Sequence, residues 1–84
     1  MSFVVTKVSR GDIHLNDGRR SVRVLGEGLL VSKPGDPAFV VYLNSIGSME
    51  FEGRIEAMGD DVRREVVGAI KEYFFERGMV VDFE

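Results

Sequence analysis

The sequence predicts an α+β fold: a mostly antiparallel sheet of four to six strands with one helix packed on one face. Two observations carry this prediction. Several short segments are rich in β-branched residues, and one segment in the C-terminal half repeats its apolar residues at helical spacing. The expected order is β-β-β-(β)-β-(β)-α-β, where parentheses mark segments whose pattern also fits a loop. The length of 84 residues suits a single domain, 1–84.

The first strand and a hairpin come from the N-terminal part of the chain. Residues 3–8, FVVTKV, predict a strand because they are rich in β-branched side chains. Asp17-Gly18 then suits a two-residue type I′ turn, and this register places Asp12 opposite Arg23. Alternation predicts one apolar face, formed by Ile13, Leu15, Val22 and Val24. The polar side chains share the other face: Asp12, His14, Asn16, Ser21 and Arg23.

The later strands are separated by turn-forming residues. Residues 29–31 fit a short strand, and residues 33–37 form a loop because of their Pro and Gly residues. Residues 39–46, FVVYLNSI, predict a strand, whereas 47–59 fit either an edge strand or a long loop. The last residues, 79–84, alternate and predict a final strand docked next to the helix.

The strand at 39–46 is more apolar than a sheet covered on one side requires. A single helix covers one face, toward which three side chains are expected to point: Phe39, Val41 and Leu43. The other three point to the second face: Val40, Tyr42 and Asn44. Two explanations stay open, because either the hairpin curls over this second face or another chain covers it.

The helix is predicted between two clear end signals. Asp60 and Asp61 supply an N-cap and negative charge for the first turn, and Arg77-Gly78 supplies the C-terminal signals. The apolar residues at helical spacing are Val62, Val66, Ala69, Ile70, Tyr73 and Phe74. Gly68 lies inside this helix, where it is unfavourable, so we expect it to mark close packing against the sheet.

The composition narrows the classes of function. The chain has no cysteine, which excludes disulfides and cysteine-based metal sites. The N-terminus lacks the long apolar run of a signal peptide, and no segment is long enough to cross a membrane, so we expect a cytoplasmic protein. The net charge of −3 argues against direct nucleic-acid binding and is compatible with a basic protein partner.

The residues that carry chemistry do not form a predicted active site. His14 shares the polar face with Asp12 and Ser21, but no strained nucleophile turn or oxyanion site accompanies them, so a solvated histidine is favoured. Glu50 and Glu52 fit an acid–base pair or the protective charges of an edge strand. We therefore predict no catalytic residue, no metal site and no cofactor.

Several blocks of sequence together resemble a known bacterial family. They are VSRGDI at 8–13, DGRRSVRV at 17–24, GE at 26–27, FVVYLNSI at 39–46 and RGMVVDFE at 77–84. This combination resembles the immunity proteins of polymorphic toxin systems, specifically the small family catalogued as number seventy-four. The resemblance spans nearly the whole chain and departs at residues 47–59, which lack the prolines of many members.

The resemblance implies a non-enzymatic cytoplasmic protein that binds the C-terminal domain of a cognate toxin, as in contact-dependent inhibition. We expect the toxin to be a nuclease, whose basic groove an acidic face can occupy. The expected electrostatic group is Glu50, Glu52 and Glu56, and the further contacts are Tyr42, Asn44 and Glu27. The alternative is a small accessory or homo-oligomerising module that associates through Val40 and Tyr42.

Overall fold

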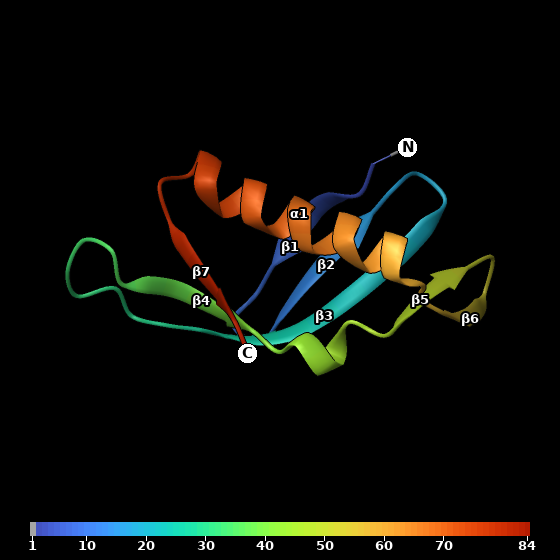
Figure 1. Ribbon diagram of the computed structural model, residues 1–84, viewed down its shortest axis with the longest axis horizontal. Coiled ribbons are helices and arrows are strands. Elements are labelled where there is room, and N and C mark those ends of the chain that lie inside the picture. The colour runs from blue at the N-terminus through green and yellow to red at the C-terminus, as the bar shows by residue number, and fades with distance from the viewer. Residues whose placement is uncertain (1) are drawn as a thin grey trace.

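The computed structural model describes residues 2–84 and confirms the α+β class, with one helix lying over a curled sheet (Figure 1). The elements in chain order are β1 (Val4–Val8), β2 (Asp12–Asn16), β3 (Arg20–Gly28), β4 (Pro37–Val41), a 3₁₀ helix η1 (Leu43–Ser45), β5 (Ser48–Phe51), β6 (Arg54–Ala57), α1 (Asp60–Glu76) and β7 (Val80–Phe83). The sheet has seven strands, because residues 47–59 contribute two rather than one.

The long strand β3 joins the two parts of the sheet. Its first residues pair with β5, its centre pairs with β2, and its last residues pair with β4, all antiparallel. The path β1-β2-β3-β4-β7 ends in a parallel pair, β4 with β7, while β5 and β6 form a hairpin at the other end of β3. The molecule is therefore elongated, measuring 42 × 21 × 21 Å (Figure 1).

The first hairpin has the predicted faces but not the predicted turn. Asp12 lies opposite Leu25 instead of Arg23, a shift of two residues that keeps every side chain on its expected face. Of the two turn residues, Gly18 alone has a positive φ, of 98°, so the predicted type I′ turn was wrong. The cause is the side chain of Asp17.

Asp17 organises this turn by accepting several hydrogen bonds. Its Oδ1 accepts the backbone N–H groups of Arg19 at 3.0 Å and Arg20 at 2.6 Å, and its Oδ2 pairs with the Arg20 guanidinium at 2.7 Å. Burial alone would raise the pKa of Asp17, but these hydrogen bonds outweigh it and lower the pKa to about 2. The turn thus contains more than two residues, because the Asp17 carboxylate binds the backbone N–H groups within it.

Residues 47–59, which fitted a strand or a loop, form a tight hairpin. Phe51 pairs with Arg54, and the two residues between them, Glu52 and Gly53, have φ values of 51° and 78°. Positive φ at both central positions is the signature of a type I′ turn. The turn type predicted for the first hairpin therefore occurs in the second one.

The strand predicted at 39–46 ends early, at Val41. The hydroxyl oxygen of Ser45 accepts the backbone N–H of Leu25 at 2.9 Å, and the chain turns there through η1. The short strand predicted at 29–31 was also wrong, because these residues form an exposed loop between β3 and β4.

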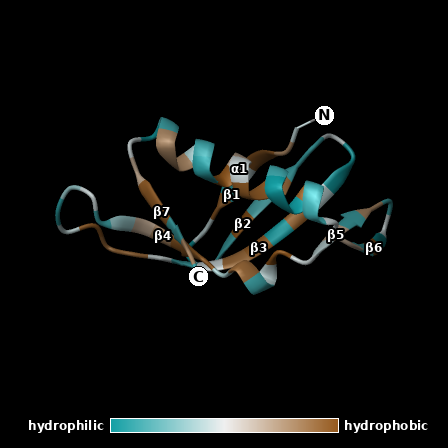
Figure 2. Cartoon of the chain, in the orientation of Figure 1, coloured by the Kyte–Doolittle hydropathy of each residue, from teal (hydrophilic) through white to brown (hydrophobic). Residues whose placement is uncertain are grey.

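On the face of β4 that is turned away from α1, the rest of the chain covers one position, Val40. Val40 is 7% exposed and lies in register between Glu27 of β3 and Asp82 of β7. Tyr42, two residues later, is 37% exposed. The remaining apolar side chains of this segment pack toward α1 in the main core, with Ile13, Leu15, Val22, Val24, Phe39, Val41, Ile46, Val66, Ile70 and Phe74. Figure 2 shows the resulting alternation of hydrophobic and hydrophilic residues along β3.

The helix has the expected span but a different N-cap and a different role for its glycine. The N-cap residue is Gly59 without a side-chain hydrogen bond, and Asp60 and Asp61 lie in the first turn. Gly78, at φ 68°, ends the helix as predicted. Gly68 is exposed with open space beside it, so the prediction of close packing there was wrong. The close approach is at Gly26, where a Cβ would collide with the Val40 carbonyl and the Phe39 ring.

Candidate partner-binding surface

The face of the sheet turned away from α1 is open to solvent, and we call it the outer face. It exists because the alternate residues of β2 and β3 are buried under the helix, which leaves their neighbours to point outward. Tyr42, directly after β4, extends it at one end, and residues of β5 and β6 extend it at the other. The outer face comprises Asp12, His14, Asn16, Ser21, Arg23, Leu25, Glu27, Tyr42, Glu50 and Ile55.

A charged cluster occupies the centre of the outer face. Asp12 lies between Arg23, at 2.8 Å from Nε to Oδ2, and His14, at 3.3 Å from Nε2 to Oδ2. Hydrogen bonds from the Ser9 hydroxyl and from Arg23 lower the pKa of Asp12 to about 2. The Asp12 carboxylate therefore stays ionised and fixes the side chains on both sides of it.

Ser21, which shares the polar face with His14 and Asp12, has a different hydrogen-bond partner. Ser21 accepts a hydrogen bond from the Asn16 side-chain amide at 3.0 Å, and neither His14 nor Asp12 forms a hydrogen bond with it. Within residues 2–84, no three His, Cys, Asp or Glu side chains come together as a metal site. Asp12 thus contacts Arg23 and His14, while Ser21 contacts Asn16, so the three residues of the sequence pattern do not form one hydrogen-bonded chain.

Beside the cluster, the outer face is hollowed where the second hairpin meets β3. The hollow has a volume of about 380 Å³, and its outward-facing lining includes His14, Asn16, Ser21, Arg23, Glu50 and Ile55. Ile55 is 71% exposed and supplies an aliphatic wall. A shallow hollow of this mixed polar and apolar lining suits a protruding side chain of a protein partner.

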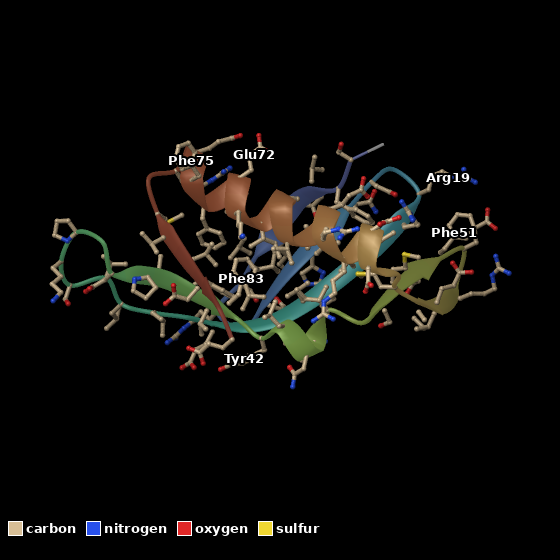
Figure 3. All side chains as sticks on the ribbon, in the orientation of Figure 1. Arg19, Tyr42, Phe51, Glu72, Phe75 and Phe83 are labelled. Carbon is tan, nitrogen blue, oxygen red and sulfur yellow. The ribbon has the colours of Figure 1, made fainter. Side chains whose placement is uncertain are left out.

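Three carboxylates and Tyr42 form the other end of the outer face, which we call the acidic end: Glu27, Tyr42, Asp82 and Glu84. Asp82 lies in register with Val40, and Glu27 and Glu84 lie near Tyr42. The Tyr42 hydroxyl donates to Glu27 Oε2 at 3.3 Å. Partial burial, and then the negative charges of Glu27 and Glu84, raise the pKa of Tyr42. None of the ion pairs formed by residues 2–84 involves these three carboxylates. Figure 3 shows carboxylate oxygens gathered beside Tyr42.

The comparison with protein families identifies the family of the chain. The family model described as immunity protein 74 matches residues 5–84, nearly the whole chain. The chain belongs to the immunity protein 74 family. The resemblance of its sequence blocks is thereby confirmed, and the partner of an immunity protein is a toxin. No curated protein and no solved structure matches the chain. The one helix in residues 2–84 is too short and too polar to span a membrane.

The contact residues predicted for this immunity protein fall into different places. Glu50 points to the outer face opposite Ser21, Glu56 pairs with Met49 on the other face, and Glu52 lies in the turn between them. The structure therefore does not bring Glu50, Glu52 and Glu56 onto a common face. It does bring Glu27 and Tyr42 together, although fifteen residues separate them in the sequence.

The tip of the second hairpin carries positive as well as negative side chains, and we call it the hairpin end: Arg19, Glu50, Phe51, Glu52 and Arg54. The guanidinium of Arg19 lies 5.2 Å from the centre of the Phe51 ring, and that of Arg54 lies 5.8 Å from it. Figure 3 places Arg19 and Phe51 side by side there. The immunity protein thus has a mixed-charge hairpin end and an acidic end whose three carboxylates form no ion pair within residues 2–84.

Sequence reasoning missed two residues of the acidic end, Asp82 and Glu84. The signal available was alternation, because Asp82 is the polar residue of the last strand. That signal places Asp82 on a face but does not say which strand lies next to it. Asn44, which was predicted, is exposed on η1, and the Arg63 side chain holds this turn by donating to the Leu43 carbonyl at 2.8 Å.

Proposed function

We propose that this immunity protein neutralises a cognate toxin C-terminal domain by binding it through the outer face and covering its active or substrate-binding site. One observation carries the choice of surface: α1 covers one side of the sheet, and the other side remains open with a tyrosine, a fixed arginine and an exposed isoleucine. Tyr and Arg are enriched at protein interfaces, where they supply large contact areas. The protein acts by occupation and performs no chemistry of its own.

The acidic end supports a basic toxin surface as the partner. Glu27, Asp82 and Glu84 have no ion pair within residues 2–84, so their charges are available to a partner. A toxin that cleaves nucleic acid needs Lys and Arg side chains in its substrate groove. We therefore propose a nuclease toxin whose groove receives the acidic end, in the cytoplasm of the cell that is protected.

The predicted residues outside the acidic end have supporting parts in this proposal. Glu50 contributes to the hollow, and Asn44 on η1 extends the contact next to Tyr42. Glu52 and Glu56 flank the contact from the turn and the opposite face of the second hairpin, where a wrapping partner would reach them. Glu27 and Tyr42 then form the centre of the interface.

Co-expression with the toxin domain tests this proposal. We expect that domain to be the variable C-terminal part of a secreted protein encoded directly upstream. Wild-type protein should restore growth, and Glu27→Lys combined with Tyr42→Ala should fail to restore it while remaining folded. Glu65→Lys on the exposed side of α1 is the matched control and should protect. Loss of protection by the helix variant alone would contradict the outer face as the binding surface.

A further inference from the structure

The strand β7 forms a free edge of the sheet. It pairs with β4 alone, in parallel, and the backbone N–H of Glu84 donates to the Val41 carbonyl at 2.8 Å. In a strand, the N–H and C=O of one residue point to the same side and those of the next residue to the other side. The backbone N–H and C=O groups of Asp82 and Glu84 point toward β4. The backbone N–H and C=O groups of Val81 and Phe83 therefore point outward, along the free edge of the sheet.

This edge lacks the protection that the other edges of the sheet have. The edge strand β1 carries Lys7 and a bulge after Val5, and the edge strand β6 carries Arg54 and Glu56. Charges and bulges of this kind keep sheet edges from pairing with other chains. The strand β7 has a single charged residue, Asp82, and is otherwise hydrophobic (Figure 2).

Apolar side chains gather next to the same edge. Phe75, in the last turns of α1, is 82% exposed, and Met79 and Val80 are also exposed. Figure 3 shows Phe75 at the outer end of the helix, close to Glu72. A hollow of about 500 Å³ lies there, lined by Lys71, Glu72, Phe75, Met79 and Val81. An exposed phenylalanine beside unpaired backbone groups is typical of an interface.

We propose that β7 pairs antiparallel with β7 of a second copy of the chain, so that one sheet runs through a two-fold symmetric dimer. With the axis at Val81, the outward groups of the two Val81 residues bond to each other. Val80 then lies opposite Asp82 of the second copy. A register centred on Asp82 would place two aspartates directly opposite each other, which is unfavourable.

The side chains beside the β7 edge favour a second copy of the chain as the binding partner. A two-fold interface must be complementary to itself, since the same patch is used twice. The apolar side chains of Phe75 and Met79 lie near the proposed axis, and the rim carries both a positive residue, Lys71, and a negative one, Glu72. The dimer uses the backbone edge of β7 and the side chains beside the end of α1, whereas the toxin contact uses side chains of the outer face; Asp82 is the residue that the two surfaces share. The dimer does not rest on the proposed toxin contact.

Hydrogen exchange and sedimentation of the isolated protein test the dimer. Sedimentation should give twice the monomer mass at high concentration, with dissociation on dilution. The amides of Val81 and Phe83 should become protected as the concentration rises, because their N–H groups form the new ladder. The amides of Asp82 and Glu84 are internal controls and should be protected at every concentration. A monomer at all concentrations, with unprotected Val81 and Phe83, would overturn the proposal.

A pair of matched variants sharpens the test. Phe75→Glu should raise the dimer dissociation constant by roughly a factor of ten or more, as expected for a central aromatic residue. Leu30→Glu places the same charge at a residue that is 97% exposed in the β3–β4 loop, and it should leave the dimer intact. If Val81 and Phe83 gain protection only when the toxin domain is added, the edge receives a toxin strand and the dimer is wrong. The ability of Phe75→Glu to protect growth is measured in a separate experiment. Failure of the dimer and failure of the proposed toxin contact can then be told apart.

Discussion

The acidic end and the hairpin end both present glutamates, but they present them in different electrostatic surroundings. At the acidic end, the three carboxylates form no ion pair within residues 2–84. At the hairpin end, two arginines stack on Phe51 beside Glu50 and Glu52. A surface of one sign attracts a basic partner during encounter, whereas a mixed surface acts mainly through direct contacts. The density of glutamates along the sequence therefore does not locate the electrostatic surface.

The two ends also have different structural supports, which mutations can break separately. The acidic end depends on the close approach of β3 and β4 at Gly26. The hairpin end depends on Asp17, whose carboxylate holds the turn that carries Arg19 and Arg20. The predictions below act on these supports and on the charges that they position, beginning with the largest expected effect.

Gly26→Ala should destabilise the protein by about 3 kcal/mol, because the added Cβ collides with the Val40 carbonyl and the Phe39 ring. Urea unfolding measures the loss. Gly68→Ala is the control, since open space surrounds that exposed helix position and alanine should stabilise it by about 1 kcal/mol. Equal stability of Gly26→Ala and wild type would contradict the close approach that supports the acidic end.

Glu27→Lys combined with Glu84→Lys should weaken binding of the toxin domain by about 2 kcal/mol, or roughly thirtyfold. The reversed charges would repel a basic groove, and the effect should shrink as salt is added. Titration calorimetry at low and high salt measures both. Unchanged affinity in this double variant would remove the acidic end from the interface, while leaving the immunity role in place.

Asp17→Asn should lower the free energy of unfolding by about 2 kcal/mol, because the turn loses its ion pair with Arg20 and part of its backbone hydrogen bonding. The folded pKa of Asp17 is about 2, below the unfolded value of 3.8. Its contribution is therefore fully present above pH about 4 and is lost as the pH falls toward 2.

Denaturant unfolding between pH 2 and pH 7, about the range in which carboxylates titrate, checks the effect of Asp17. The Asn variant should lose less stability than wild type on acidification. Asp61→Asn, at an exposed ion pair with Arg64, serves as the control and should change little. Parallel pH curves for wild type and Asp17→Asn would show that the carboxylate does not hold the turn.

Glu50→Lys combined with Glu52→Lys should have the smallest effect on toxin binding, below about 1 kcal/mol. Glu50 alone points to the outer face, and Arg19 and Arg54 already make this end mixed in charge. Growth protection should persist in cells that express the toxin domain. A greater loss here than from the Glu27 and Glu84 reversal would move the electrostatic contact from the acidic end to the hairpin end.

Part of the proposed binding surface could be predicted from the sequence. The alternation in β2 and β3 placed Asp12, His14 and Arg23 on the outer face, since a strand repeats every two residues whatever its register. Tyr42 and Glu27 were predicted individually. Their contact was not predictable, because it depends on the pairing of β3 with β4 across a loop that carries no register signal.

Two of the wrong predictions, the type I′ turn of the first hairpin and the length of the strand at 39–46, share a physical cause, which is the hydrogen bonding of one side chain to a neighbouring or distant backbone. Asp17 replaced a two-residue turn with a wider one by binding two backbone N–H groups. Ser45 ended the β4 segment by bonding to Leu25, twenty residues earlier. Residue propensities describe local preferences, and these preferences correspond to small differences in free energy. Hydrogen bonds from side chains to the backbone can therefore override them.

The sequence by itself determined the α+β class, the span of α1, the two faces of the first hairpin and the membership of the immunity protein 74 family. These follow from periodicity and from sequence blocks that match the family, both of which are read along the chain. Only the tertiary structure decided that β7 lies parallel to β4, which brings Asp82 beside Val40 and Glu84 near Tyr42 and leaves a hydrophobic edge free. Strand partners are chosen by packing of the whole sheet on one helix, and no local pattern encodes that choice.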